Sequence, residues 1–594
     1  MEGLDDFGGD EDAALRYAIA LSLQESGNGP PEKPIELSSD EEDGDLDKGP
    51  KYPSVTQETK SSPTKPSKEA MPKDTQALSQ SPPSTAPPSI FAALGLDRKK
   101  MEEERLARMG KRKAPDYESE TQGPQQRPRL DISLRNKTSS LQAESTAKVG
   151  RHALPYPKGV VKKTWSKGFP RGDDIKIEEV LQKDELELAV ISSFQWDDEW
   201  MLSKIDCSRT KLLLVAFASN EAQQKEMKAN TPKGAPIKFC FPPMTQTGNM
   251  HSKLQLLRYP KYLRIVVPSG NLVPYDWGET GVIENIVFLI DLPRIDDPKS
   301  HSSNKLGPFG EELCYFLRAQ RLDERLVDSL ANFDFSEANR YRFVHTIGAS
   351  HVGDKWQRTG YCGLGRAVTS LGLNTTKDIE IDLVVSSLGS LNMDLVSAIY
   401  YAAQGDNGMK EYGMRTTKSG KNKPPARAQL NLEDKFRIYF PSHDTVLQSR
   451  GGKNSAGTIC VQSKWWNSAT FPRELIRDCK SVRSGLLIHS KVMLVRHSDS
   501  GKSKAAYAYV GSANLSESAW GRLVKERGTG NPKLTCRNWE CGVIVPISPQ
   551  DPGEDNPERP GLAAFHSAVP VPMKTPAEAY GATKSKHPWL FLEN

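Results

Sequence analysis

Two His-x-Lys tripeptides, each followed downstream by an asparagine, are the residues of this chain best suited to do chemistry together. They are His251-Ser252-Lys253 with Asn271, and His489-Ser490-Lys491 with Asn514. An imidazole and an ammonium on one side of the backbone suit an oxyanion or a phosphate, and an amide adds a neutral N–H donor. Because the same elements recur in the same order, the sequence indicates an internal duplication with one site shared by two halves.

Apolar residues flank both tripeptides, so each is expected within a buried β-strand, with His and Lys on one face and Ser on the other. Each repeat continues through a second strand and closes on a carboxylate ahead of a further strand. These carboxylates, Glu284 and Glu540, are expected to hydrogen-bond the far nitrogen of a histidine and fix its tautomer. Asn514 is expected to open a helix over 515–523 whose first amides favour an anion.

This set of side chains could hydrolyse a phosphodiester. One histidine could act as the nucleophile and the other as acid and base, while Lys253, Lys491 and the two asparagines hold the phosphoryl oxygens. The tripeptides lack the spacing of zinc hydrolases, so neither a metal nor another cofactor is expected. For one tripeptide alone, a satisfied core histidine beside a surface lysine is the simpler interpretation, whereas the matched pair favours a function.

Composition sets broad limits on the kind of protein. The 594 residues are 37% hydrophobic and carry a formal net charge of +5, which is too small to indicate a nucleic-acid partner by itself. The 8 cysteines contain no CxxC pair, which is typical of a reducing compartment. With no run of 18 apolar residues and no secretory leader, a soluble intracellular protein without a membrane partner is expected.

Residues 1–155 are expected to form a disordered regulatory region, because 48–89 are rich in Pro, Ser, Thr and Lys. Within it, 11–25 has the spacing of a ubiquitin-interacting motif, with Ala18, Ile19 and Ser22 as binding residues. A solvated acidic helix without function is the alternative. Basic clusters at 98–100 and 111–113 suggest a bipartite nuclear-import signal over 98–113, with the charged face of a surface helix as the alternative.

Strands and helices alternate through the rest of the chain, which predicts an α/β fold with mixed sheets. The division lies near 335–345, giving halves at 156–340 and 341–594. Expected strands include 186–193, 212–218, 263–267, 286–290, 342–347, 381–385 and 436–439, with a helix at 308–321 and surface loops at 418–425 and 549–560.

The paired H-x-K and Asn motifs resemble the phospholipase D superfamily over roughly 160–594. At the Asp position of its usual motif, H-x-K-x4-D, this chain has Arg258 and Arg496, as is typical of the tyrosyl-DNA phosphodiesterase branch. The resemblance implies two pseudo-symmetric halves sharing one active site in a monomeric core. It also implies an enzyme that removes protein adducts from DNA 3′ ends, in particular the phosphotyrosyl link of a stalled topoisomerase I. The import signal at 98–113 predicts a location in the nucleus.

The same resemblance implies the roles of individual residues. His251 is the nucleophile that forms a phosphohistidine, and His489 protonates the departing tyrosine and then activates water. Ser387, Ser390 and Ser516 lie near the DNA backbone. The chain departs from the family in two places: a glutamine often stands where Glu284 is placed, and an aromatic residue commonly precedes the first histidine, where this chain has 247–250.

Two other functions fit part of the sequence. A lipid or nucleic-acid phosphodiesterase of the same superfamily would use the same motifs, but the two arginine replacements and the lack of a membrane-binding amphipathic stretch disfavour a lipid substrate. A ubiquitin-reading adaptor with an inert catalytic fold would need only 11–25, yet both catalytic pairs are intact.

Overall fold

The computed structural model describes residues 154–232, 234–245, 247–296, 304–417, 431–497, 506–547, 561–580 and 586–591. The motifs expected at 11–25 and 98–113 and the loops expected at 418–425 and 549–560 lie outside the described residues. Among the helices that are described, none is both long and apolar enough to cross a membrane.

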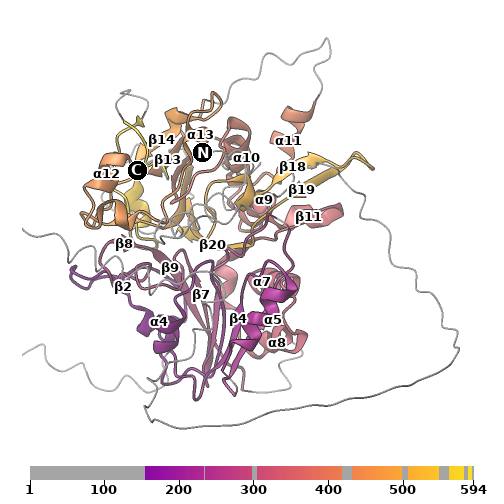
Figure 1. Cartoon of the computed structure of the whole chain (residues 1–594). Helices are drawn as coiled ribbons and strands as arrows, with labels where there is room; N and C mark the ends of the chain where they lie inside the picture. Colours follow the sequence, from indigo (N-terminus) through magenta and orange to yellow (C-terminus); the bar gives the residue numbers. More distant parts are fainter. Residues whose placement is uncertain are drawn as a thin grey trace, which may run out of the picture.

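The first half of the fold is built on one mixed sheet (Figure 1). Its strand order is β2(Asp174–Ile175), β1(Val160–Thr164), β9(Ile286–Pro293), β7(Tyr262–Pro268), β6(Gln255–Arg258), β3(Leu188–Ser192), β4(Lys211–Val215) and β5(Ile237–Cys240). From β1 to β3 each neighbouring pair is antiparallel, and β3, β4 and β5 run parallel. The first tripeptide therefore enters the sheet next to β6, a central strand.

The sheet of the second half repeats the pattern from β1 to β5 and, within the described residues, has no counterpart of β2. Its order is β10(Arg342–Thr346), β20(Glu540–Ile547), β17(Ala506–Gly511), β16(Lys491–His497), β12(Ile379–Val384), β13(Phe436–Phe440) and β14(Ile476–Asp478). Neighbours are antiparallel up to β12, and β12, β13 and β14 are parallel. The duplication predicted from the sequence is thus present in the topology, and the expected pair of α/β halves with mixed sheets is confirmed.

The two sheets face each other across a shared core and are covered on their outer faces by helices. The shared core joins side chains such as Ile265 and Phe288 of the first sheet to Leu494 and Val543 of the second. The outer helices are α3(Ile177–Leu181), α4(Asp198–Ser203) and α5(Glu221–Ala229) on the first sheet, and α9(Gly360–Ser370) and α10(Met393–Ala403) on the second. The halves therefore form one body of four layers.

Smaller elements complete the described part of the chain. A ladder of β11(Ser350–His351), β19(Pro532–Thr535) and β18(Arg522–Lys525) and a pair formed by β15(Leu487–Ile488) and β8(Ile283–Glu284) lie outside the main sheets. The remaining α-helices are α7(Gly307–Ala319), which packs into the shared core, and α8(Glu324–Asp328), α11(Met409–Thr416), α12(His443–Leu447), α13(Ser463–Trp466) and α14(Glu517–Trp520).

Two local predictions are wrong. The tripeptides precede or begin their strands rather than lying within them, since β6 starts at Gln255 and β16 at Lys491. The helix expected over 515–523 is a single turn, α14, which Ser516 caps by accepting a hydrogen bond from Ala519 N. Gly521, at φ +83°, ends this turn, and the chain continues as β18 because that segment pairs with β19.

Candidate active site

Each histidine is anchored to the backbone of the opposite half. His251 N donates to Trp539 O at 3.0 Å, and His489 N donates to Glu284 O at 2.9 Å. Pairing of β8 with β15 extends the second contact, with Glu284 opposite Ile488. The two tripeptides thereby meet between the halves, as the sequence predicted, and both histidine side chains are more than nine-tenths buried.

The imidazole of His251 is oriented by Glu540, from the second half. His251 Nδ1 lies 2.9 Å from Glu540 Oε2. The carboxylate also accepts hydrogen bonds from the Ser512 hydroxyl and from Asn538 Nδ2. Burial alone would raise the pKa of Glu540, but His251 and Lys253 outweigh it and hold that pKa below its ordinary value. With Nδ1 engaged, the free nitrogen of His251 is Nε2.

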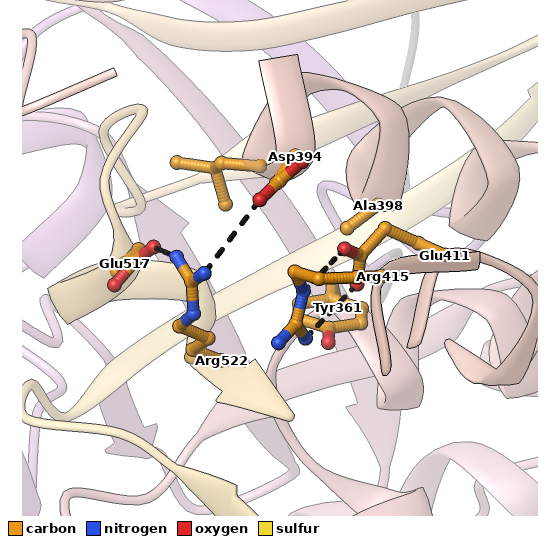
Figure 2. A pocket seen from close by; sticks show the side chains of 9 residues that line it. Tyr361, Asp394, Ala398, Glu411, Arg415, Glu517 and Arg522 are labelled. Atoms are coloured by element: carbon orange, nitrogen blue, oxygen red, sulfur yellow. Dashed lines mark hydrogen bonds and ion pairs between the residues drawn. The ribbon is translucent and has the colours of Figure 1, made fainter. Parts of the chain in front are cut away.

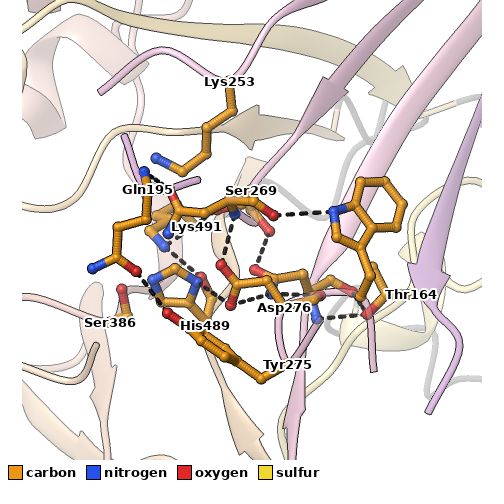
Figure 3. Close-up of polar contacts among 12 residues, drawn as sticks. Thr164, Gln195, Lys253, Ser269, Tyr275, Asp276, Ser386, His489 and Lys491 are labelled. Atoms are coloured by element: carbon orange, nitrogen blue, oxygen red, sulfur yellow. Dashed lines mark hydrogen bonds and ion pairs between the residues drawn. The ribbon is translucent and has the colours of Figure 1, made fainter. Parts of the chain in front are cut away.

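The imidazole of His489 is paired with Asp276, from the first half. Asp276 Oδ1 lies 3.1 Å from His489 Nδ1, and Asn271 N and Asn285 Nδ2 donate to the same carboxylate at 2.6 and 3.1 Å (Figure 3). Against the effect of burial, His489 and Lys491 lower the pKa of Asp276 to about 2. Burial first, and then the neighbouring lysine charges, lower the pKa of His489 to about 4 even though Asp276 opposes them.

The expected pairing of Glu284 with a histidine is wrong. Arg483 Nε and the Ser481 hydroxyl donate to the Glu284 carboxylate instead, in a buried ion pair. Two equivalent hydrogen bonds show which residues of the two halves correspond. Cys541 N donates to Ser512 Oγ, and Ile286 N donates to Ser269 Oγ, each at 3.0 Å.

Because Ile286 therefore matches Cys541, the residue that corresponds to Glu540 is Asn285. The Ser269 hydroxyl donates to Asn285 Oδ1 at 2.9 Å, just as the Ser512 hydroxyl donates to Glu540. A neighbour one residue away along a strand points to the opposite face. The one-residue difference therefore turns Glu284 away from the site, and Asp276 supplies the missing carboxylate.

The two lysines lie beside the histidines and are almost entirely buried. Lys253 Nζ donates to His251 O at 2.9 Å, and Lys491 Nζ donates to His489 O at 2.5 Å. Burial and the charge of Lys253 lower the pKa of Lys491. An anion between the lysines would relieve both effects, so the pair is suited to a phosphoryl group.

Backbone N–H groups hold both asparagine side chains in one orientation. Asn271 Oδ1 accepts from Gln195 N at 3.3 Å, and Asn514 Oδ1 accepts from Ser386 N and Ser387 N at 3.2 and 3.1 Å. With the amide oxygens engaged, each Nδ2 is the group left to donate to a substrate. The sequence prediction of two equivalent donors agrees with this geometry.

The three serines expected near DNA come from two segments on the Asn514 side of the site. Ser387 binds the Asn514 amide oxygen through its backbone, and Ser390 follows three residues later and is exposed. Ser516 is buried, and its hydroxyl oxygen caps α14.

Sequence reasoning missed four residues that line the site. Asp276 lay within the repeated pattern, but Ala519 stands at the matching place in the other half, so the repeat gave no signal. Gln195 and Tyr275 are joined by a hydrogen bond of 2.6 Å from the Tyr275 hydroxyl to Gln195 Oε1. The Phe194 ring lies 5.2 Å from the His251 ring, so an aromatic neighbour of this histidine comes from a distant segment rather than from 247–250.

A separate cavity between α10, α11 and β18 does not compete with this site. It has a volume of about 10 Å³, and its charges are paired with one another (Figure 2). Arg522 pairs with Glu517 and Asp394, and Arg415 pairs with Glu411. Within the described ranges, no group of three or more His, Cys, Asp and Glu side chains is arranged to hold a metal ion.

Comparison with known proteins places this geometry in a family. The family model of tyrosyl-DNA phosphodiesterase matches residues 160–581, and a ubiquitin interaction motif model matches residues 10–26, where such a motif was expected. The crystal structure of the yeast tyrosyl-DNA phosphodiesterase is similar with a TM-score of 0.50 at 18% identity, covering 73% of this chain and all of that one.

Two curated proteins are similar in sequence. Tyrosyl-DNA phosphodiesterase 1 of Arabidopsis thaliana is 24% identical over 401 residues, and a probable tyrosyl-DNA phosphodiesterase of Caenorhabditis elegans is 23% identical over 345 residues. These matches cover 63% and 54% of this chain, and 59% and 66% of the relatives, which is less than two thirds of the length of either. Since the family model spans well over half of the sequence, the chain belongs to the tyrosyl-DNA phosphodiesterase family.

Proposed function

We propose that this protein is a DNA repair phosphodiesterase that hydrolyses the bond between a DNA 3′ phosphate and a tyrosine, as left by a stalled topoisomerase I. The observation that carries the proposal is that each imidazole is held by a carboxylate of the opposite half, His251 by Glu540 and His489 by Asp276, beside two buried lysines and two asparagine amides. Such a set can supply a nucleophile, an acid and phosphoryl-oxygen donors from protein side chains alone.

In the first step, the His251 Nε2 lone pair attacks phosphorus and the bond to the tyrosine oxygen breaks. The proton of the His489 imidazolium goes to that oxygen, so a neutral tyrosine leaves and the DNA 3′ phosphate is held as a phosphohistidine. Lys253, Lys491 and the two asparagines bind the phosphoryl oxygens as the geometry changes. Glu540 keeps the His251 Nδ1 proton in place, which makes Nε2 the attacking atom.

In the second step, water attacks phosphorus and gives a proton to His489, the phosphorus–nitrogen bond breaks, and DNA with a 3′ phosphate is released. His489 ends the cycle protonated, as it began, with a proton taken from water. Its pKa of about 4 in the free protein means that the substrate must assist its protonation. The phosphate charge offsets Lys253 and Lys491, which are among the groups that lower this pKa.

The test is cleavage of a single-stranded oligonucleotide with a 3′-phosphotyrosine by the full-length chain in excess EDTA. Release of tyrosine with a 3′-phosphate product supports the proposal. No cleavage of this substrate, together with hydrolysis of phosphatidylcholine vesicles in the same buffer, would contradict it and favour the lipid phosphodiesterase. The same preparation, sized by sedimentation, tests the expected monomer.

We also propose that residues 10–26 bind ubiquitin and bring the enzyme to ubiquitylated adducts. The match of this segment to a ubiquitin interaction motif supports the idea. Ala18→Glu with Ser22→Glu should abolish binding to monoubiquitin in a titration followed by NMR. Unchanged binding would contradict the proposal. A chain that binds ubiquitin but fails to cleave the phosphotyrosyl oligonucleotide would be an adaptor.

A nuclear location is proposed from the basic clusters at 98–100 and 111–113, since the DNA substrate is found there. A fluorescent fusion with both clusters changed to alanine should lose nuclear accumulation, and its retention in the nucleus would refute the signal.

A further inference from the structure

The two segments that hold the asparagine side chains are structurally equivalent but chemically different. Gln195 N binds Asn271 Oδ1 in the first half, and Ser387 N binds Asn514 Oδ1 in the second. One residue further on, Trp196 bridges Leu272 and Leu388 bridges Leu515, both in parallel register. Gln195 therefore corresponds to Ser387.

The same comparison matches Tyr275 with Ser518, since each lies four residues after its asparagine. The second half thus has small hydroxyl side chains at both positions, whereas the first half has a carboxamide and a phenol. Gln195 and Tyr275 are half-buried, and Ser518 is buried. These side chains break the approximate two-fold symmetry of the site. Gln195 and Tyr275 form a bulkier wall on the side of the first half.

This wall lies on the side of His489. Tyr275 precedes Asp276, whose carboxylate pairs with His489 Nδ1, and Figure 3 draws Tyr275, Gln195, His489 and Lys491 in the same part of the site. The Tyr275 hydroxyl donates to Gln195 Oε1 at 2.6 Å, which fixes both side chains and leaves Gln195 Nε2 to donate elsewhere. Tyr275 also packs against the core of the second half, so its ring is supported from behind.

We propose that Gln195 and Tyr275 form the subsite for the leaving group, which is an aromatic phenol carrying a peptide. This rests on the proposed function, in which His489 protonates the departing oxygen, because the leaving group must then lie next to His489. An aromatic ring and a carboxamide donor suit a tyrosine ring and peptide carbonyls. The serines of the second half leave room for a sugar–phosphate backbone and can donate to its oxygens.

The two steps of the reaction separate this role from a general structural one. The leaving group is present when the phosphohistidine forms and absent when it is hydrolysed. A leaving-group subsite should therefore affect adduct formation alone, whereas a residue that binds DNA or supports the catalytic side chains should affect adduct breakdown as well.

The experiment follows both steps by rapid quench and denaturing gels, with excess full-length enzyme. The substrates are oligonucleotides with a 3′-phosphotyrosyl peptide or a 3′-phenyl phosphate, which share a phenolic leaving oxygen. We expect Gln195→Ala and Tyr275→Ala to slow adduct formation about tenfold on the peptide substrate, a change equivalent to about 1.4 kcal/mol, and less on the phenyl substrate. Adduct breakdown should stay within about twofold of the parent chain, which also shows that the variants are folded.

Ser387→Ala is the matched control. Its effect should grow with oligonucleotide length and should not depend on the leaving group. Equal slowing of both steps by Gln195→Ala and Tyr275→Ala, or effects that ignore the leaving group, would overturn the subsite. A parent chain that forms no adduct with either substrate would overturn the proposed function itself.

Discussion

The two histidines occupy equivalent places in the two halves, but the carboxylates that hold them do not. Glu540 comes from the first residue of β20, whereas the matching residue before β9 is Asn285, and Asp276 reaches His489 from another segment. In both cases the carboxylate comes from the half opposite its histidine. The duplicated fold therefore places the two histidines equivalently, and residue differences in the first half allow the two imidazoles to have different roles in the reaction.

The largest difference between the histidines should appear when each is removed. His251→Ala should lose at least about 10⁴-fold in activity and form no adduct, because the nucleophile is missing. His489→Ala should still form adduct, because a tyrosine oxygen leaves more readily than an alcohol, but breakdown should be slow. Adduct formation by His251→Ala at the parent rate would assign the nucleophile elsewhere.

Replacing the two carboxylates should distinguish the roles of the two histidines in the same way, with smaller losses of activity. We expect Asp276→Asn and Glu540→Gln each to reduce activity about 10–100-fold, the range typical of residues that orient a reactive group. A p-nitrophenyl leaving group needs no proton, so it should restore adduct formation in Asp276→Asn but not in Glu540→Gln. Equal rates of adduct formation by the two variants in rapid-quench assays with this substrate would contradict the different roles of Asp276 and Glu540.

The low pKa of His489 should also affect stability. The pKa of His489 is 6.5 in the unfolded chain and about 4 in the folded chain, so between these two pH values the folded chain binds fewer protons than the unfolded chain. The contribution of His489 to the free energy of unfolding is therefore fully present above pH 6.5 and is lost as the pH falls towards 4. His489→Asn should flatten the decline in the melting temperature of the full-length chain over this window. Burial lowers the pKa of His345 and His351 as well, so part of the decline should remain. An unchanged slope would show that His489 is not buried in its neutral form.

Glu284 should have the smallest effect on the chemistry. Glu284→Gln breaks a buried pair with Arg483, so the melting temperature should fall, by an amount that corresponds to about 3 kcal/mol. The rates of adduct formation and breakdown should remain within about threefold of the parent chain well below the melting temperature. A loss as large as that of Asp276→Asn would restore Glu284 to the catalytic set.

The repeated residues could be predicted from the sequence because each is marked twice. The His, Lys and Asn pairs and the order of strands around them follow from a pattern that the fold repeats. Glu284 and Asn285 both precede the same apolar strand, so the sequence alone does not show which of them faces the site, and only the Ser269 hydrogen bonds fix the alignment of the two halves. Asp276, Gln195 and Tyr275 are the places where the halves differ, so a repeat could not reveal them.

The most direct test of this division of labour is to locate the phosphate in the trapped adduct. His489→Ala would be incubated with the 3′-phosphotyrosyl oligonucleotide, digested at neutral to alkaline pH, and analysed by mass spectrometry. We expect a nucleotide phosphate on His251 and no adduct in the His251→Ala chain. Phosphate on any other residue, or an adduct that forms without His251, would contradict it.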